Sequence, residues 1–320
     1  MALSTHISPV PKLALGTAPI GSMSANFGKA VSDDAAHATI QHAIARGANF
    51  IDTAPLYGNG LAEARVGAAL QGIPRSSYIL GSKVGWIPDP ANIGGNHNTD
   101  GTRSYTRDAI RRSVEASLKR LNTDYLDYAL VHDPELIDST KIILDEAFPT
   151  LNDLKHQGVV RAVGAGLNIS DYMIEFATHA DVDCFLLAGR YTLLEQAPMK
   201  DAFPLMLQKK ISVFLGGVFN SGILATGAVQ GARYQYVIAP EPIMRLTRLI
   251  EGVCYRHGVS LRTAAAQFAA AHPAVTTLVL GMVQPDEVDE NLAALNAKLP
   301  AAFWDELKER GLIEADAPVP

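Results

Sequence analysis

The chain has 320 residues, of which 48% are hydrophobic, and its formal net charge is -6 at pH 7. This length allows either two domains or one α/β barrel, since such barrels typically run to about 250 residues. The mild charge and the absence of any Lys/Arg-rich run argue against a nucleic-acid partner.

The first residues of the chain and its two cysteines indicate the cellular compartment that we expect. The first residues show no cationic start followed by an apolar run, and no long apolar stretch occurs elsewhere, so we expect neither a signal peptide nor a membrane span. Cys184 and Cys254 lie far apart in apolar or helical surroundings, which suits a reducing cytosol. No Cys/His spacing indicates a metal site, and a cytoplasmic location is expected.

Apolar strands and helical patterns alternate along the whole chain. The strand-like runs lie at 13–16, 49–53, 78–84, 126–132, 160–167, 183–189, 211–217 and 276–282. The helical patterns that follow them lie at 33–46, 61–71, 106–120, up to about 156, and at 170–179, 200–209, 241–257, 261–271 and 285–295. Continuous apolar strands are expected when both faces of a sheet are buried.

Eight such units without a change in composition predict one (β/α)8 TIM barrel, forming a single domain over residues 1–320. A doubly wound sheet is the alternative, but the strand count and the even spacing favour the barrel. Residues 300–320 are expected to add a C-terminal helix and a tail.

Three of the strands end in polar residues that suit one chemistry. Asp52 closes the strand in FIDTAPLYG and Tyr57 follows it, Lys83 closes YILGSK, and His132 closes LDYALVH. The carboxyl ends of barrel strands meet at one rim, so we expect these four side chains to lie together. One polar residue at a strand end usually has no function, but this ordered set is hard to attribute to chance.

The four residues suit the movement of a proton on and off an oxygen. A free Tyr has a pKa of about 10, and a buried Lys83 ammonium beside Tyr57 is expected to lower that pKa, with Asp52 keeping the Lys charged. His132 would hydrogen-bond a carbonyl or alcohol oxygen. Since no nucleophile has its own base, the set indicates alcohol–carbonyl interconversion with a hydride carrier rather than acyl transfer.

The motifs FIDTAPLYG, LGSKVG and LDYALVH resemble the three stretches that carry the Asp–Tyr–Lys–His tetrad of the aldo-keto reductases. The resemblance extends from LALGTAPIG to VDENLAAL, which is nearly the whole chain. It implies a (β/α)8 barrel that binds a nicotinamide cofactor in extended form at the C-terminal face. It also implies that Asp52, Tyr57, Lys83 and His132 are catalytic.

The family's contacts to the nicotinamide are matched unevenly. Asn168 matches the Asn of a Ser-Asn pair that holds the carboxamide, but Leu167 replaces the Ser. Arg190 stands where the family commonly has Gln. Gly216 stands in place of a Tyr that stacks on the nicotinamide, and Phe219 is the candidate to take over part of that packing.

Glycines near the seventh strand suit the pyrophosphate. Gly216, Gly217 and Gly222 would let backbone N–H groups approach a phosphate closely, although a glycine-rich turn by itself usually indicates only a turn.

The stretch LGMVQPDEVDENL aligns with the part of the family that wraps the adenosine ribose. Gly281, Met282 and Glu287 stand where members that use NADPH have basic or hydroxyl residues, and Glu290 and Asn291 match the acid and amide that bind adenine. A carboxylate repels a 2′-phosphate but accepts from a 2′-hydroxyl, so Glu287 favours NAD, with NADP as the alternative. A solvated Glu287 on a helix is the other interpretation.

Residues 85–104 form the longest polar stretch and follow a strand, so they are expected at the C-terminal face. Trp86 is the candidate wall of a substrate pocket, whereas His97 is more simply a solvated loop residue. Residues 85–104 and 219–240 would set substrate specificity.

LLAGRYTLLEQ and GGVFNSGIL are similar to the subgroup of D-threo-aldose 1-dehydrogenases, also described as L-fucose dehydrogenases. This implies NAD-dependent oxidation of a small-molecule sugar such as L-fucose, L-galactose or D-arabinose at C1 to its lactone, with Tyr57 as proton acceptor. Oxidation of pyridoxal, NADPH-dependent reduction of small aldehydes, and a binding subunit without turnover are the alternatives. The oligomeric state is left open.

Overall fold

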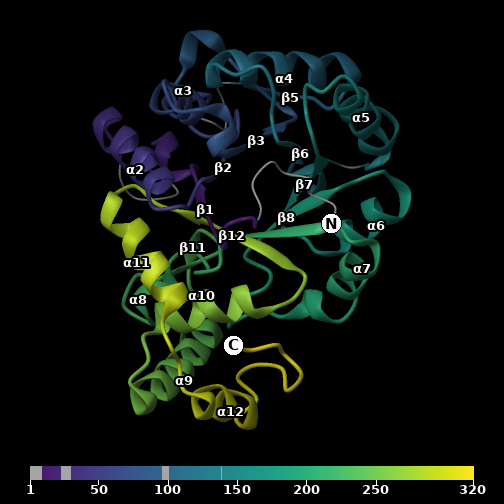
Figure 1. Cartoon of the computed structure of the whole chain (residues 1–320). Coiled ribbons are helices and arrows are strands. Elements are labelled where there is room, and N and C mark those ends of the chain that lie inside the picture. Colours follow the sequence, from purple (N-terminus) through teal and green to yellow (C-terminus); the bar gives the residue numbers. More distant parts are fainter. Residues whose placement is uncertain (1–8, 23–29, 96–100, 138) are drawn as a thin grey trace.

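The computed structural model describes residues 9–22, 30–95, 101–137 and 139–320. His97 lies outside the described residues. Figure 1 shows the chain as a ring of helices around a central set of strands.

Eight parallel strands close into a barrel. They are β1 (Leu13–Gly16), β2 (Phe50–Asp52), β3 (Ile79–Val84), β6 (Tyr128–His132), β7 (Val163–Leu167), β8 (Cys184–Ala188), β9 (Ser212–Gly216) and β12 (Val275–Gly281). Neighbours in the barrel follow the chain order, and β12 pairs with β1 to close it. The predicted (β/α)8 barrel is therefore confirmed, and the doubly wound sheet is wrong.

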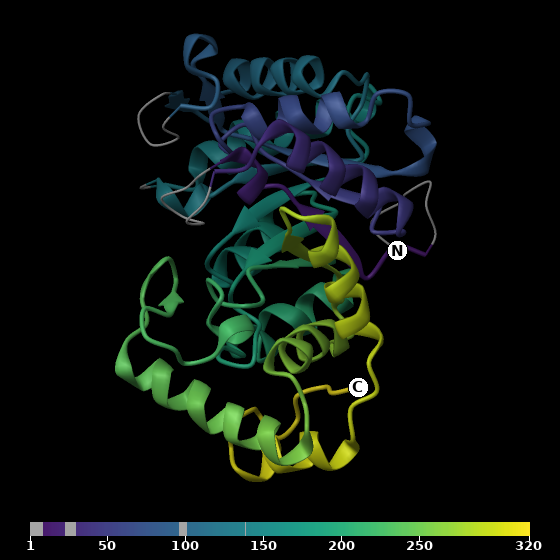
Figure 2. The same ribbon diagram turned by 90° about the vertical axis from the view of Figure 1, so that its left-hand side faces the viewer.

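Helices cover the outside of the barrel (Figure 2). They are α2 (Asp33–Ala45), α3 (Leu61–Ala69), α4 (Arg107–Leu121), α5 (Phe148–His156), α6 (Asp171–His179), α7 (Ala202–Lys209), α8 (Ile223–Thr226), α9 (Glu241–His257), α10 (Leu261–Ala271), α11 (Pro285–Asn296) and α12 (Ala301–Glu309). The Ser32 side chain caps α2 by accepting from the Ala35 N–H, and Thr106 caps α4 in the same way. Glu306 ties α12 to Arg256 and His257 of α9.

Two short hairpins were not predicted. β4 (Trp86–Pro88) pairs with β5 (Gly101–Arg103), and β10 (Arg233–Tyr234) pairs with β11 (Val237–Ile238). Their strands have only two or three residues, which is too short for a recognisable alternation. Both follow barrel strands, so they add structure to the stretches expected to set specificity.

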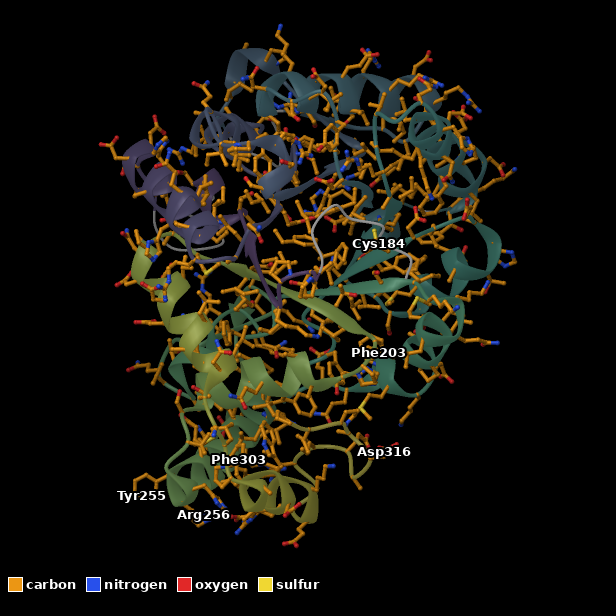
Figure 3. The ribbon with its side chains drawn as sticks, viewed as in Figure 1. Cys184, Phe203, Tyr255, Arg256, Phe303 and Asp316 are labelled. Carbon is orange, nitrogen blue, oxygen red and sulfur yellow. The ribbon has the colours of Figure 1, made fainter. Side chains whose placement is uncertain are left out.

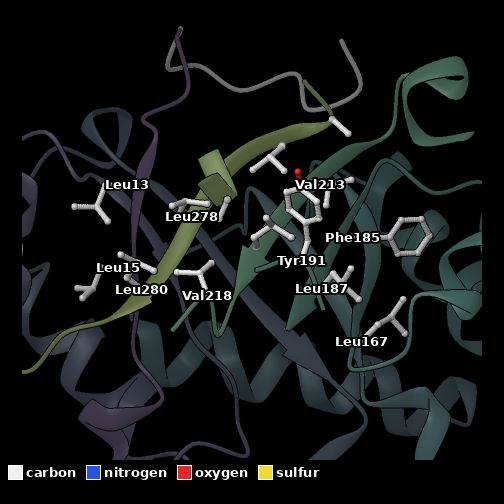
Figure 4. Packing of buried hydrophobic residues seen from close by; sticks show 14 of the residues in the cluster. Leu13, Leu15, Leu167, Phe185, Leu187, Tyr191, Val213, Val218, Leu278 and Leu280 are labelled. Carbon is white, nitrogen blue, oxygen red and sulfur yellow. The ribbon is translucent and has the colours of Figure 1, made fainter. Parts of the chain in front are cut away.

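The core has an inner and an outer layer. The outer layer lies between strands and helices and includes Leu13, Leu15, Leu278 and Leu280 (Figure 4). The inner layer fills the barrel, and Cys184 belongs to it (Figure 3).

Three aromatic rings form much of the inner layer. The ring centroids of Phe50, Tyr128 and Phe214 lie 5.1 to 5.3 Å apart. Gly81 makes room for them, because a Cβ at this position would come 2.0 Å from the Tyr128 ring. This layer supports the strand ends where the polar residues lie.

Within the described ranges, no helix is long and apolar enough to cross a membrane. In the same ranges, no group of three or more His, Cys, Asp or Glu side chains is placed to hold a metal ion. Cys184 and Cys254 are both buried and free.

Candidate active site

The structure brings Asp52, Tyr57 and Lys83 into direct contact at the C-terminal rim of the barrel. The Lys83 ammonium donates to Asp52 Oδ2 at 2.6 Å, to the Tyr57 oxygen at 3.0 Å and to the Thr53 carbonyl at 3.0 Å. Asp52 and Lys83 are buried, with exposed fractions of 2% and 1%. One cation is thus fixed between a carboxylate and a phenol, and its three donors are all used.

The turn after β2 holds Tyr57 in place. Gly58 and Gly60 have φ of 60° and 96°, which glycine adopts without strain. A Cβ on Gly58 would lie 2.1 Å from the Gly21 carbonyl oxygen, so the turn packs directly on the segment Pro19–Gly21. The glycines of the motif therefore serve to position the phenol.

His132, the last residue of β6, faces Tyr57. The two rings are nearly perpendicular, with centroids 5.7 Å apart. Burial, followed by the charges of Lys83 and Arg103, holds the pKa of His132 well below its usual value. The imidazole is therefore neutral near pH 7 and can donate one hydrogen bond to a ligand oxygen.

The protonation of Tyr57 differs from the expectation. Burial raises the pKa of the Tyr57 phenol above its usual value, and the opposing charge of Lys83 does not fully offset it. The predicted lowered pKa is therefore wrong in its net direction, since desolvation of the phenolate outweighs the cation. Burial by itself disfavours the charged Lys83, but Asp52 and Tyr57 raise the Lys83 pKa, so the ammonium stays charged.

Tyr128 is a contact that the sequence did not reveal. Its hydroxyl donates to Asp52 Oδ1 at 3.0 Å from inside the barrel. Asp52 thus uses one oxygen for Lys83 and the other for Tyr128. The alternation of β6 puts Tyr128 and His132 on the same inward face, which is the signal that could have identified it.

The residues expected at the nicotinamide carboxamide are held by a polar network. The Asn168 side-chain amide donates to Asp133 Oδ1 and Glu135 Oε1, both at 3.0 Å. Arg190 donates to the Asn168 carbonyl at 2.6 Å and to Glu195 at 3.1 Å. Asn168 and Arg190 are therefore in direct contact, and acids that the sequence interpretation did not include hold each of them in place.

The glycines after β9 form a tight turn. Gly217 has a φ of 62°, and a Cβ there would lie 3.1 Å from the Gly189 backbone nitrogen. Gly216 ends β9, and Gly222 precedes α8. Turn geometry thus explains Gly217, and also Gly222 with its φ of 100°, while a role of the three glycines at a pyrophosphate remains a prediction.

Two residues expected at the adenine, together with Phe219, which was expected at the nicotinamide, gather around an Arg that the sequence interpretation missed. Arg262 of α10 pairs with Glu290, donates to Asn291 Oδ1 at 3.1 Å, and lies over the Phe219 ring at 5.7 Å. Arg262 Nε and Asn291 Nδ2 are buried donors without a partner among the described residues. Arg262, Glu290 and Asn291 thus form one cluster, and a role for it at the adenine remains a prediction.

Glu287 has a contact that was not foreseen. Its Oε2 accepts from the Val283 and Gln284 N–H groups at 2.6 and 3.2 Å, which forms a capping box at the start of α11. Met282 is fully buried, and a Cβ on Gly281 would come 2.7 Å from the Pro19 ring. Packing thus accounts for Gly281 and Met282, two of the positions where family members that use NADPH have basic or hydroxyl residues.

Trp86 is the first residue of β4 in the β4–β5 hairpin, and its side chain is packed against the structure around it. It is only 6% exposed, its indole N–H donates to Asn59 at 3.3 Å, and Gly101 leaves room for its ring. A Cβ on Gly101 would lie 2.5 Å from that ring. Trp86 can therefore offer a ligand no more than a small part of its surface.

The sequence pattern of the Aldo/keto reductase family matches residues 12–311. The chain belongs to the aldo-keto reductase family. It is similar to a D-threo-aldose 1-dehydrogenase from Pseudomonas sp, with 35% identity over 95% of each chain. It is also similar to a pyridoxal 4-dehydrogenase from Microbacterium luteolum, with 30% identity over 95% of each chain.

Among solved structures, an aldo-keto reductase from Bacillus halodurans in its holo form superposes with a TM-score of 0.77. That comparison covers 96% of this chain and 94% of the other at 24% identity, and it supports the barrel fold. Membership of the aldo-keto reductases, together with the named dehydrogenases, makes this chain an NAD(P)-dependent oxidoreductase.

Proposed function

We propose that this aldo-keto reductase oxidises an aldose at C1 to its lactone with NAD, taking sugars of the L-fucose, L-galactose or D-arabinose type. The observation that carries the proposal is the Lys83 ammonium bonded to both Tyr57 and Asp52 at the rim. The similarity to the Pseudomonas aldose dehydrogenase supports the choice of sugar. The two free cysteines suit a reducing compartment, and the cytoplasm is the proposed location.

The side chains have separate roles in this proposal. Tyr57 in its phenolate form, which Lys83 stabilises, accepts the proton of the sugar hydroxyl and becomes a neutral phenol. Asp52 keeps Lys83 charged, and neutral His132 donates to the reacting oxygen. The nicotinamide, when bound, supplies the hydride acceptor. An anomeric hydroxyl suits this site because the sugar ring oxygen stabilises the positive charge that develops at C1.

The cofactor contacts follow from the family alignment. Asn168 and Arg190 would hold the carboxamide, and Gly216, Gly217 and Gly222 would approach the pyrophosphate. Glu290 and Asn291, joined by Arg262, would hold the adenine, and Phe219 would take over part of the packing on the nicotinamide.

The residues at and just after the end of β12 support a preference between NAD and NADP. Glu287 disfavours a 2′-phosphate by its charge, while Gly281 and Met282 contribute packing. We therefore propose NAD as the preferred coenzyme, with NADP as the alternative.

Pyridoxal is the second candidate substrate. The 30% identity to a pyridoxal 4-dehydrogenase favours it, and pyridoxal also presents a cyclic hemiacetal to a base such as Tyr57. Reduction of small aldehydes with NADPH would need the same proton carrier acting in the opposite direction.

The experiment supplies each aldose, pyridoxal and a small aldehyde with the appropriate coenzyme, follows the absorbance of the reduced nicotinamide, and identifies products by mass spectrometry. A lactone formed from an aldose supports the proposal. Oxidation of pyridoxal alone would favour the second candidate. Reduction of simple aldehydes alone, or tight coenzyme binding without any turnover, would contradict the dehydrogenase assignment.

A further inference from the structure

Asp133 is an ionisable residue at the rim that the proton-transfer scheme does not use. It directly follows His132, and its backbone N–H donates to the Gly166 carbonyl at 3.0 Å. Its φ is 46°, in the left-handed region where Asp and Asn are tolerated best. The backbone of β6 and its neighbour β7 thus fixes this carboxylate next to the catalytic strand end.

The two oxygens of Asp133 have different surroundings. Oδ1 accepts from the Asn168 amide at 3.0 Å, which sets the orientation of the carboxylate. Oδ2 lies 3.8 Å from His132 Nε2, which is too long for a hydrogen bond. The side chain is 19% exposed, and because Oδ1 is bonded to Asn168, Oδ2 is the oxygen left for a ligand.

The same imidazole indicates where the reacting oxygen lies. His132 Nδ1 is buried and has no partner among the described residues. Nε2 is therefore the ring nitrogen that can reach a substrate, and it is the nitrogen that Asp133 Oδ2 adjoins.

We propose that Asp133 determines specificity by accepting a hydrogen bond from the hydroxyl next to the reacting carbon, which is the C2 hydroxyl of an aldose. This inference rests on the proposed function. A sugar whose C1 oxygen lies at His132 Nε2 brings its neighbouring C2 hydroxyl toward Asp133 Oδ2. A carboxylate is an acceptor only, so it pairs with this hydroxyl and not with the sugar ring oxygen.

The Asp133 carboxylate also disfavours substrates that lack the neighbouring hydroxyl. Asp133 becomes more buried when a ligand covers the rim, and a substrate without a neighbouring hydroxyl leaves Oδ2 desolvated and unpaired. A site built to bond a hydroxyl rejects an analogue that lacks it more strongly than an apolar pocket does. The proposal thus separates polyhydroxylated sugars from simple aldehydes.

The test compares D-arabinose with 2-deoxy-D-ribose, which is its counterpart without the C2 hydroxyl. Wild type should prefer D-arabinose by about 10- to 100-fold in kcat/KM, the range for a hydrogen bond to a charged group. Asp133→Asn suits the φ of 46° and keeps an amide oxygen for Asn168. It should narrow the preference about tenfold, because charge-assisted bonds are roughly twice as strong as neutral ones. Turnover of 2-deoxy-D-ribose should change little.

Glu135→Gln is the matched control, since Glu135 also accepts from the Asn168 amide. Through Asn168 it should affect both sugars alike and leave their ratio unchanged. If wild type oxidises both sugars equally well, or if Asp133→Asn leaves the ratio intact, the role of Asp133 is refuted while the aldose proposal stands. If wild type oxidises neither these sugars nor the other aldoses, the proposed function is wrong and the role of Asp133 falls with it.

Discussion

Two halves of the same rim are organised differently. At the ends of β2, β3 and β6, the polar side chains contact one another directly, and Lys83 bonds both Asp52 and Tyr57. After the ends of β7, β8, β9 and β12, expected cofactor residues such as Asn168 and Asn291 bond residues from loops and helices, such as Glu135 and Arg262. Strand register thus positions the first half, which we call the strand-fixed half. Contacts from loops and helices position the second, which we call the loop-fixed half.

Removing the phenol oxygen should have the largest effect in the strand-fixed half. Tyr57→Phe keeps the ring against His132 but removes the proton carrier, so kcat should fall about 100-fold or more. Coenzyme affinity, measured by fluorescence titration, and Tm should stay near wild type. Turnover within a few-fold of wild type would disprove the assignment of Tyr57.

Lys83→Met should lose a similar amount of activity and, unlike Tyr57→Phe, should also lower stability. The variant leaves Asp52 buried without its cation, which typically costs about 3–5 kcal/mol of unfolding free energy. Urea unfolding of the two variants, measured side by side, checks this difference. Equal stability of Lys83→Met and wild type would show that the buried pair is not structurally important.

The pH profile tests the net direction of the Tyr57 shift. Because burial raises the pKa of Tyr57, the phenol is protonated at pH 7 and the accepting form becomes more abundant as pH rises. Oxidation should therefore increase with pH, by up to about tenfold per unit while chemistry limits the rate. His132, whose pKa is lowered, should add no limb near neutrality. A plateau beginning below pH 8 would instead indicate a lowered Tyr57 pKa.

In the loop-fixed half, Glu287→Gln should narrow the preference for NAD over NADP in kcat/KM by about fivefold to tenfold, the scale of one exposed charge near a phosphate. Gln also serves the capping box, so α11 should keep its start and Tm should not change. Preference for NADP in the wild type would refute the proposed role of the carboxylate.

The smallest effect on kcat is expected for a change at Tyr128, which lies inside the barrel and bonds Asp52 of the strand-fixed half. Tyr128→Phe removes the hydrogen bond to Asp52 Oδ1 but keeps the ring, so kcat should fall about threefold to tenfold, the scale of one hydrogen bond. Tyr191→Phe is the control, because the buried Tyr191 hydroxyl has no partner among the described residues. Equal activity of both variants would show that Tyr128 does not act through Asp52.

The barrel was predictable because its signal repeats. Eight apolar runs recur along the chain at even spacing. Asp52, Lys83 and His132 stand at or next to strand ends, where the strand register brings them to one rim. The net pKa shift of Tyr57 was not predictable, because it depends on how completely neighbours exclude water. Burial is a property of the folded chain, and a sequence motif does not contain it.

The side-chain contacts of the loop-fixed half could not be predicted from the sequence, for a geometric reason. Arg262 lies 28 and 29 positions before Glu290 and Asn291, on a helix that carries no motif. Glu287 could be interpreted as facing a ribose or solvent, yet its side chain closes on the backbone only three and four residues away. Predicting such contacts requires the directions of side chains on two packed helices.

The space left by Gly81 has a consequence for engineering this barrel. Filling small gaps in a core is a common route to higher stability, but any side chain at Gly81 would displace the Tyr128 ring. That ring carries the hydroxyl bonded to Asp52, so a substitution intended for the core would also move a charge in the active site. Thermostabilisation of this enzyme is therefore better directed at helix ends and surface loops than at the layer beneath the rim.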